Sequence, residues 1–387
     1  MKEKQLLMIP GPTPCPADVL LAHARPMINH RGPQFKAMLL EVTENLKKVF
    51  RTQNDVFILT SSGTGAMEAA IVNTLSPGDK VLSLSIGNFG NRWAKIAKIF
   101  GADVTKVDFP LGTAVDVNEL RKYLQADTAK EYKAVLVQFN ETSTGVVNPL
   151  PEIAAAVHEH GALILVDAVS GLGAIDLDTD GLGLDVVCAG SQKAFMCPPG
   201  LAFISFSKRA LAAAAEAKMA RFYFDILEAK KLADNGQTPW TPAIPQFYGM
   251  QVGLRMMMEE GLDNFQGRHL RLRNATRAAV KALGLKLLVE DDAIASPVIT
   301  AIYAPEAIGP DPIRKLALEK YGVVYAVGQD ALKPIVFRIG HLGYVNDADV
   351  FAALSVLGSV LVELGFDCDP AAGVVAAQQS ITAALAK

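Results

Sequence analysis

The chain has 387 residues, half of them apolar, so it exceeds one typical domain and can bury a substantial core. Its 37 Lys and Arg residues nearly balance 40 Asp and Glu residues, for a formal charge of −3 without blocks of like charge, which argues against a nucleic-acid partner. The N-terminus lacks the apolar region of a secretory signal, and no stretch reaches about 18 consecutive apolar residues, so we expect no membrane association and a cytoplasmic location.

Short β-rich runs alternate with helical patterns from about residue 55 onward. This alternation indicates βαβ units and a mostly parallel, doubly wound α/β sheet. Because the last three runs have little helix between them, we expect one antiparallel strand near the end of the sheet. The predicted strands are 55–60, 80–86, 102–107, 133–139, 162–168, 185–191 and 201–206, and the predicted helices are 65–75, 92–100, 117–124 and 151–160.

The pattern changes past Ser207 to long helical stretches separated by a proline-rich segment, "QTPWTPAIPQF", which we expect to be an extended, projecting loop. The sequence from about residue 284 reads as a small α+β domain with an alanine-rich terminal helix or frayed end. We therefore expect an N-terminal arm (1–20), a large domain (21–270) and a small domain (271–387). The predicted helices are 208–231, 251–283, 312–321 and 347–364, and the predicted strands are 297–303 and 334–340. The alanine-rich tail is 371–387.

Polar loops follow the predicted strands, and in a parallel α/β sheet such loops line one crevice. The first, "TSSGTGAMEAA", places Ser62, Gly63 and Thr64 where a helix begins, so hydroxyl and backbone N–H groups can cradle a phosphate. It matches neither the P-loop nor the dinucleotide fingerprint. An ordinary serine-rich helix N-cap would explain the same residues.

Two further loops carry an aromatic residue and a polar cluster. Phe89, between Gly87 and Gly90, can lie flat over a planar ligand, although core packing would also explain an isolated aromatic. The loop "NETSTG" sets residues 140–145 just past a strand, where capping of the next turn is the alternative explanation.

Asp167 and Lys193 are the two charged residues that stand in apolar surroundings. Asp167 ends the run "ALILVD", where a carboxylate needs a cationic partner to offset burial. Lys193 follows 26 residues later in "AGSQKAFMCPPG", and a buried lysine, with its pKa lowered, can form a Schiff base with a carbonyl group. A salt bridge is the commoner role of such a lysine. A phosphate cradle, a flat aromatic, an aspartate and a lysine together are what pyridoxal 5′-phosphate (PLP) requires.

The sequence resembles the class V aminotransferases of PLP fold type I, in particular the alanine–glyoxylate and serine–glyoxylate (serine–pyruvate) branch. The resemblance covers essentially the whole chain and implies a seven-stranded sheet in the large domain. The motifs that carry it, in family order, are "PGPTPCP", "NHRGPQF", "TSSGTGAMEAA", "GNFGNRW", "NETSTGVVNPL", "LILVDAVSGLG", "GSQKAFMCPPGLAF", "TPWTPAIPQFYG" and "VFRIGHLG".

The resemblance also implies a role for each candidate site residue. Lys193 would be the Schiff-base lysine, and Asp167 would hold the pyridine nitrogen of PLP. The sequence departs from the family at Phe89, where many relatives carry Trp or Tyr, and at Thr238 and Trp240, where some relatives place a phosphate-binding tyrosine. The other implied roles are stacking on the ring for Phe89, phosphate binding for Ser62, Gly63, Thr64 and Gln192, contact with the ring hydroxyl for Thr142, phosphate contact from the neighbouring subunit for Thr241, binding of the substrate carboxylate for Arg338, and proximity to the substrate for Pro10 and Gly11.

The implied function is a PLP-dependent aminotransferase that acts as a homodimer with shared active sites. It would move an amino group from alanine or serine to glyoxylate or pyruvate through pyridoxamine phosphate. The alternatives are another PLP enzyme, such as a lyase or desulfurase, and a non-catalytic subunit, for example one associated with a hydrogenase. Gln192 argues against a desulfurase, because those relatives have histidine before the lysine. No metal site is predicted, since the four cysteines form no C-x-x-C pair.

Overall fold

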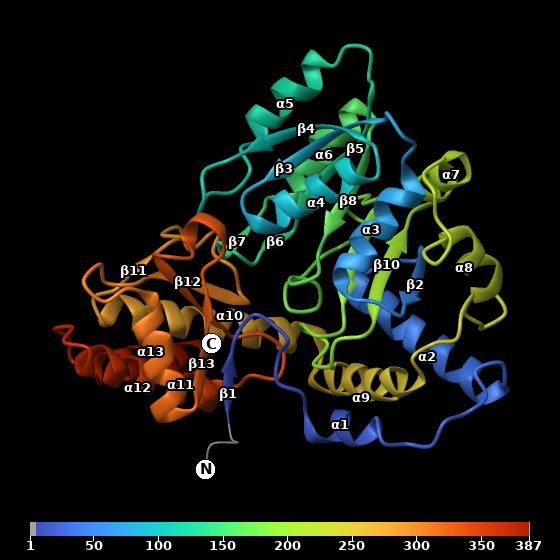
Figure 1. The fold of residues 1–387 in the computed structure, drawn as a ribbon. Coiled ribbons are helices and arrows are strands. Elements are labelled where there is room, and N and C mark those ends of the chain that lie inside the picture. Colours follow the sequence, from blue (N-terminus) through green and yellow to red (C-terminus); the bar gives the residue numbers. More distant parts are fainter. Residues whose placement is uncertain (1–4, 387) are drawn as a thin grey trace.

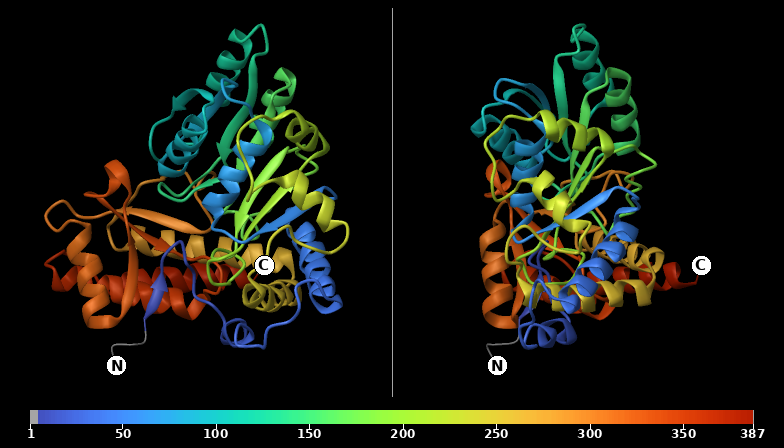
Figure 2. Two further views of the ribbon diagram at one scale, coloured as in Figure 1. Left: turned by 45° about the vertical axis from the view of Figure 1, so that its right-hand side comes forward. Right: turned by 90° about the vertical axis from the view of Figure 1, so that its right-hand side faces the viewer.

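A computed structural model describes residues 5–386, so the first four residues of the predicted arm and the last residue of the predicted tail lie outside it. Figure 1 shows an α/β unit, coloured blue to yellow, beside a second unit coloured orange to red. Figure 2 shows the same two units from other directions, with the N-terminal strand lying against the second one. No helix of residues 5–386 combines the length and the apolar character needed to cross a membrane.

The α/β unit is built on a seven-stranded sheet with the strand order β2-β10-β9-β8-β5-β3-β4. Strand β10 runs antiparallel to both of its neighbours and the other pairs are parallel, which confirms the predicted mostly parallel sheet with one antiparallel strand. The strands are β2 (Asp55–Leu59), β3 (Lys80–Ser85), β4 (Asp103–Asp108), β5 (Tyr132–Gln138), β8 (Leu163–Asp167), β9 (Val186–Gly190) and β10 (Ala202–Phe206).

Two separate apolar cores cover the two faces of this sheet, as expected for central strands buried on both sides. In β8, Ile164 and Val166 belong to the core shared with helices α2, α5, α6 and α9, whereas Leu163 and Leu165 belong to the core shared with α3, α4, α7 and α8. The alternation places Asp167 on the α3 and α4 face. The helices are α2 (Pro33–Phe50), α3 (Gly63–Thr74), α4 (Asn88–Ile99), α5 (Val117–Ala126), α6 (Leu150–His160), α7 (Lys208–Glu216), α8 (Ile226–Ala233) and α9 (Ile244–Glu260).

The second unit is a five-stranded sheet with the order β1-β13-β14-β12-β11, packed against helices. Strand β1 (Leu6–Met8), from the predicted arm, pairs in parallel with β13, a pairing the sequence analysis did not predict. The predicted boundary at residue 270 falls inside α10, so the division into domains stays a prediction. The remaining elements are α1 (Ala17–Ala22), α10 (Leu262–Ala282), β11 (Lys286–Leu287), β12 (Ile299–Tyr303), α11 (Pro310–Tyr321), β13 (Val323–Val327), the 3₁₀ turn η1 (Asp330–Leu332), β14 (Val336–Gly340), α12 (Asp347–Glu363) and α13 (Ala372–Leu385).

Two helix predictions past residue 207 are wrong in their extent. The stretch 208–231 is two helices, because the Asp225 side chain caps a new start by accepting from the N–H groups of Leu227 and Glu228. The stretch 251–283 breaks at Gly261, whose φ of 83° ends α9.

The proline-rich segment is not an extended loop throughout. Helix α9 begins inside it at Ile244, with a proline in the first turn, where the missing amide costs no hydrogen bond. Its earlier part lies against the chain rather than projecting freely. The Trp240 ring stacks on Phe222 at 4.7 Å, and its indole N–H donates to the Tyr223 carbonyl.

Two buried histidines make hydrogen bonds within the second unit, His269 from α10 and His341 from the residue after β14. His269 Nε2 accepts a hydrogen bond of 2.9 Å from the Gly343 N–H, and His341 Nε2 lies 3.0 Å from the Thr300 hydroxyl. Burial lowers the pKa of each imidazole to about 3, so both are neutral in the folded protein at pH 7.

We predict that these histidines make the fold labile to acid. Because their pKa in the folded state is below the unfolded value of 6.5, the unfolded chain binds more protons between pH 6.5 and 3. The stability they contribute is complete above pH 6.5 and falls with pH by up to about 1.4 kcal/mol per pH unit for each histidine. Urea unfolding at several pH values measures this loss.

The variant His269→Gln keeps an acceptor without the titration, so its stability should fall less steeply between pH 6.5 and 4.5. His158→Gln, at an exposed position, is the control and should follow the wild type. Equal slopes for wild type and His269→Gln would contradict the prediction.

Candidate active site

Lys193 follows β9 and meets the N-terminal arm. Its Nζ donates a 2.6 Å hydrogen bond to the Pro10 carbonyl, and its own carbonyl accepts from the Thr13 hydroxyl. Gly11 has a φ of 136°, and a Cβ there would lie 2.6 Å from Lys193 Nζ, so only glycine fits this close approach. The structure thus brings Pro10, Gly11 and Lys193 together. Burial, with a contribution from the positive charge of Arg338, lowers the pKa of Lys193 to about 8, which raises the share of neutral amine near pH 7.

Asp167 ends β8 with its side chain almost fully buried, at 4% exposure. Its Oδ1 accepts from the Val169 N–H at 3.0 Å. Burial raises its pKa to about 7, although that hydrogen bond opposes the shift. Within residues 5–386 no cation forms an ion pair with this carboxylate, so the partner that the sequence analysis expects is not supplied by a neighbouring side chain.

The phosphate cradle predicted from the sequence lies at the N-terminus of α3. Ser62 is the N-cap residue, yet its side chain makes no capping hydrogen bond. A Cβ on Gly63 would lie 2.7 Å from a Val169 methyl group, which explains the glycine. Gln192 lies beside this helix start. Its Oε1 atom and the Gly63 nitrogen are both close to Gly190, since a Cβ placed on Gly190 would lie 3.0 Å from the first and 3.5 Å from the second. That amide oxygen is buried without a partner among the described residues.

Phe89 is the second residue of α4 and its ring is partly buried. The guanidinium carbon of Arg92, one turn further along α4, lies 4.6 Å from the ring centroid. Arg92 Nη1 also donates to the Thr64 hydroxyl at 3.3 Å. Helices α3 and α4 lie side by side (Figure 1), so the aromatic ring and the cradle are neighbours.

Thr142 and Arg338 meet where the two units join. The Thr142 hydroxyl donates to Ser170 Oγ at 2.7 Å, and its carbonyl accepts a 2.6 Å bond from Arg338 Nη1. Arg338 Nε and Nη2 donate to the Val327 carbonyl, and the side chain is 3% exposed. The resemblance implies that Arg338 binds a substrate carboxylate, and within the described part of the chain its hydrogen-bond partners are carbonyl oxygens. Burial lowers the pKa of Arg338 to about 10. Two of its five N–H groups remain for a ligand.

Thr241 is the candidate residue that the structure leaves apart from this cluster. Its side chain is exposed, and no hydrogen bond joins it to the other candidates within the described part of the chain. The segment around it is tied to the end of β2 by a bond from the Ala243 N–H to the Thr60 hydroxyl at 3.3 Å.

Comparison with known proteins decides the family. The profile of the aminotransferase class-V family matches residues 19–345. The chain belongs to the class V aminotransferases. The L-aspartate–glyoxylate aminotransferase of Paracoccus denitrificans is 39% identical to it over 383 residues, covering 98% of this chain and 96% of the relative. The soluble hydrogenase 42 kDa subunit of Anabaena cylindrica is 46% identical over 379 residues, covering 97% and 98%.

The structural comparison agrees with the family. The crystal structure of ureidoglycine–glyoxylate aminotransferase from Bacillus subtilis matches this class V aminotransferase with a TM-score of 0.92 at 28% identity, covering 99% of each chain. The predicted family, aminotransferase class and α/β fold are therefore confirmed.

Sequence reasoning missed the role of Glu141 in this aminotransferase. The carboxylate is fully buried and accepts four hydrogen bonds, from the N–H groups of Phe89, Gly90 and Ser143 and from the Ser143 hydroxyl, at 2.6–3.1 Å. Burial raises its pKa, and these bonds oppose the shift. The signal in the sequence was a lone acidic residue in the polar loop "NETSTG", which capping of a turn explained equally well.

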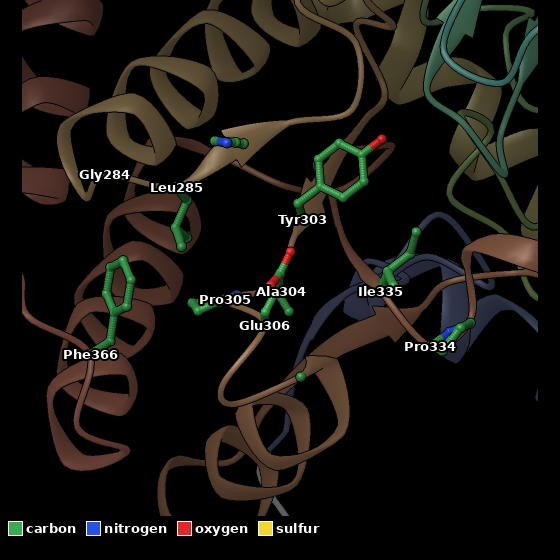
Figure 3. A pocket seen from close by; sticks show the side chains of 11 residues that line it. Gly284, Leu285, Tyr303, Ala304, Pro305, Glu306, Pro334, Ile335 and Phe366 are labelled. Carbon is green, nitrogen blue, oxygen red and sulfur yellow. The ribbon is translucent and has the colours of Figure 1, made fainter.

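A separate pocket of about 770 Å³ lies in the second unit. Figure 3 shows Leu285 and Phe366 on one side of it and Tyr303 and Ile335 on the other. None of its lining residues belongs to the candidate set, so this pocket and the Lys193 cluster are different places. Among residues 5–386, no group of three His, Cys, Asp or Glu side chains is arranged to hold a metal ion.

We predict that Glu141→Gln destabilises the fold and loosens Phe89. An amide keeps the size of the carboxylate but turns an NH₂ donor toward N–H groups that need an acceptor. Leaving buried donors unpaired costs about 1–3 kcal/mol, which urea unfolding measures. Glu319→Gln, at an exposed position near the C-terminal end of α11, is the matched control and should not lower stability. Wild-type stability in Glu141→Gln would show that the network is dispensable.

Proposed function

We propose that the protein is a PLP-dependent aminotransferase that moves the amino group of a small amino acid, alanine or serine, to glyoxylate or pyruvate. The observation that carries the proposal is a lysine with its pKa lowered to about 8 in one buried cluster with an aspartate that has no cationic partner within the described part of the chain. These are the two protein groups that PLP chemistry requires. The names of the glyoxylate aminotransferases among its relatives support the same reaction class.

The residues of the cluster fit PLP in charge and hydrogen bonding. The N-terminus of α3, with the free Ser62 hydroxyl and a glycine at Gly63, suits a phosphate group. Gln192 lies beside this helix start, and the NH₂ group of its side chain could donate to a phosphate bound here. A protonated ring nitrogen would supply the cation that Asp167 lacks. Phe89 would stack on the ring, and Thr142 would contact the ring hydroxyl.

When bound, PLP supplies an aldehyde that takes up the amino group and a ring that delocalises charge from the substrate Cα. The amine of Lys193 would serve as the general base that takes the substrate Cα proton and as the general acid that returns it. The negative charge of Asp167 would favour a protonated ring nitrogen. Arg338, with two N–H groups left for a ligand, holds the substrate carboxylate as a planar fork. Gly11 leaves space for the substrate beside Lys193.

A non-catalytic role in a hydrogenase complex is the second candidate, favoured by the name of the Anabaena cylindrica relative. A lyase or desulfurase that uses the same cofactor is the third. The purified chain on its own, given alanine, serine or aspartate with glyoxylate or pyruvate, separates these. Formation of the matching 2-oxo acid supports the aminotransferase, sulfide release from cysteine supports a desulfurase, and absence of all turnover supports a subunit role.

We predict that Lys193→Ala lowers transamination by at least about 100-fold in the same assay and abolishes the covalent retention of cofactor on the chain after borohydride reduction. No other amine of the cluster stands in its place. Lys208→Ala, at an exposed lysine that begins α7, is the matched control and should keep both signals. Undiminished turnover in Lys193→Ala would contradict the assignment, whereas a changed circular dichroism spectrum would trace the loss to folding.

We propose further that the protein is a homodimer in which Thr241 reaches the phosphate of the neighbouring subunit. The support is an exposed aromatic surface beside Thr241, where Phe222 is 74% exposed and stacks on Trp240. Monomers rarely leave such rings in water without a partner.

The cytoplasmic location also stays a prediction.

If the sites are shared, PLP binds the dimer better than the monomer, and cofactor should promote association. We predict a dimer by analytical ultracentrifugation of the PLP-loaded protein, and dissociation of the cofactor-free protein at higher concentrations than the loaded one. A monomer that retains full cofactor and full activity on dilution would overturn the shared-site proposal.

A further inference from the structure

Arg92 is a cation without a carboxylate partner beside the cradle. Within residues 5–386 no Asp or Glu forms an ion pair with it. Its Nη1 donates to the Thr64 hydroxyl at 3.3 Å, and its guanidinium carbon lies 4.6 Å from the centre of the Phe89 ring. It therefore touches one residue proposed to bind the phosphate of PLP and one proposed to stack on its ring. Its positive charge also acts on the pKa of both Asp167 and Lys193, which places it close to the centre of the cluster.

The proposed phosphate ligands of this chain are all neutral. Ser62, Gly63, Thr64 and Gln192 offer hydroxyl, amide and backbone groups, and the start of α3 adds a partial positive charge of about half a unit. A phosphate ester at pH 7 carries a charge of about −1.5 to −2. These groups therefore offset only part of the charge that the phosphate brings into a partly buried site.

The other cations of the cluster are engaged elsewhere. Lys193 Nζ donates to the Pro10 carbonyl at 2.6 Å, and the proposed reaction requires this amine at the carbonyl carbon of the cofactor. Three nitrogens of Arg338 donate to the Val327 and Thr142 carbonyls. Arg92 donates one of its five N–H groups to the Thr64 hydroxyl, and the other four remain for a ligand.

We infer that Arg92 is the cation that binds and neutralises the cofactor phosphate at the N-terminus of α3. This inference rests on the proposed function. Thr64 orients the guanidinium toward the cradle, and two of its free N–H groups can bind two phosphate oxygens at once, as arginine does with phosphate. In this arrangement the guanidinium also contacts the ring of Phe89, so the same arginine helps to fix that ring.

A purely structural role makes a different prediction. If Arg92 serves only to orient Phe89 by its contact with the ring, its removal weakens ring stacking and affects every ligand with a pyridine ring equally. If Arg92 binds the phosphate, its removal affects only ligands that carry one. Pyridoxal has the same ring as PLP and no phosphate, so the pair of ligands separates the two roles.

The experiment measures the dissociation constants of PLP and pyridoxal for the cofactor-free protein by quenching of its tryptophan fluorescence. Arg92→Gln removes the charge and should weaken PLP by about 10- to 100-fold, the range expected when a charged hydrogen bond is lost. Pyridoxal should change by less than about 3-fold. Arg92→Lys keeps the charge without the fork, and its PLP affinity should fall between those of the wild type and Arg92→Gln.

Lys95→Gln is the matched control, since it removes the same charge from an exposed position three residues further along α4. It should leave both dissociation constants at their wild-type values. Circular dichroism verifies the fold of each variant. Should Arg92→Gln fail to fold, Arg92→Lys, which loses the planar fork, should still weaken PLP more than pyridoxal.

Equal weakening of PLP and pyridoxal in Arg92→Gln, or no change in either, would overturn the phosphate role of Arg92 and leave the proposed function in place. Wild-type protein that binds neither ligand would overturn the proposed function and this inference together. Selective loss of PLP in Arg92→Gln, with Lys95→Gln unchanged, supports both.

Discussion

The buried carboxylate of Glu141 is the constraint on which the geometry of the site depends. Its four hydrogen bonds join the start of α4, which carries Phe89, to the loop that carries Thr142. The carbonyl of Thr142 in turn holds Arg338, which comes from the other sheet. A charge with no exposure to water is tolerated here because each oxygen faces two donors. Phe89, the polar loop and Arg338 are therefore held together by hydrogen bonds within the protein itself.

Charge balance is the second constraint. Glu141 and Asp167 place two carboxylates in one buried region, where burial is the main cause of the raised pKa of Asp167 and the charge of Glu141 adds to it. Lys193, Arg92 and Arg338 oppose them with three cations, but none of the three forms an ion pair with Asp167. A ligand with a cationic ring and an anionic phosphate would complement this distribution, because the ring could pair with Asp167 and the phosphate with a cation such as Arg92.

The sequence was enough for the large sheet, because β strands buried on both faces read as apolar runs such as "ALILVDA", and the missing helices before residue 202 indicated the antiparallel strand. The sequence was not enough where the structure depends on contacts between residues far apart in the chain. Strand β1 is three residues long and exists through its pairing with β13, more than 300 positions away in the chain. The break at Asp225 and the carbonyl partners of Arg338 depend on side chains that local patterns do not place. Lys193 and Asp167 could be predicted because a charged residue within an apolar run is unusual. Glu141 and Arg92 lie in polar runs, where a charged residue is common and gives no signal.

The N-terminal strand also links the two sheets mechanically. Pairing with β13 fixes residues 6–8 on the second sheet, and Pro10 and Gly11 follow at once against Lys193 on the first. A Cβ on Gly340, at the end of the strand that carries Arg338, would lie 2.3 Å from the Ile9 backbone, so the arm and this strand are in direct contact. The Pro10 carbonyl and the Arg338 guanidinium therefore both come from the second sheet and the arm paired with it, and both lie near Lys193. Any shift of the second sheet relative to the first would move them together, which couples the surroundings of Lys193 to the position of Arg338 through the same short strand.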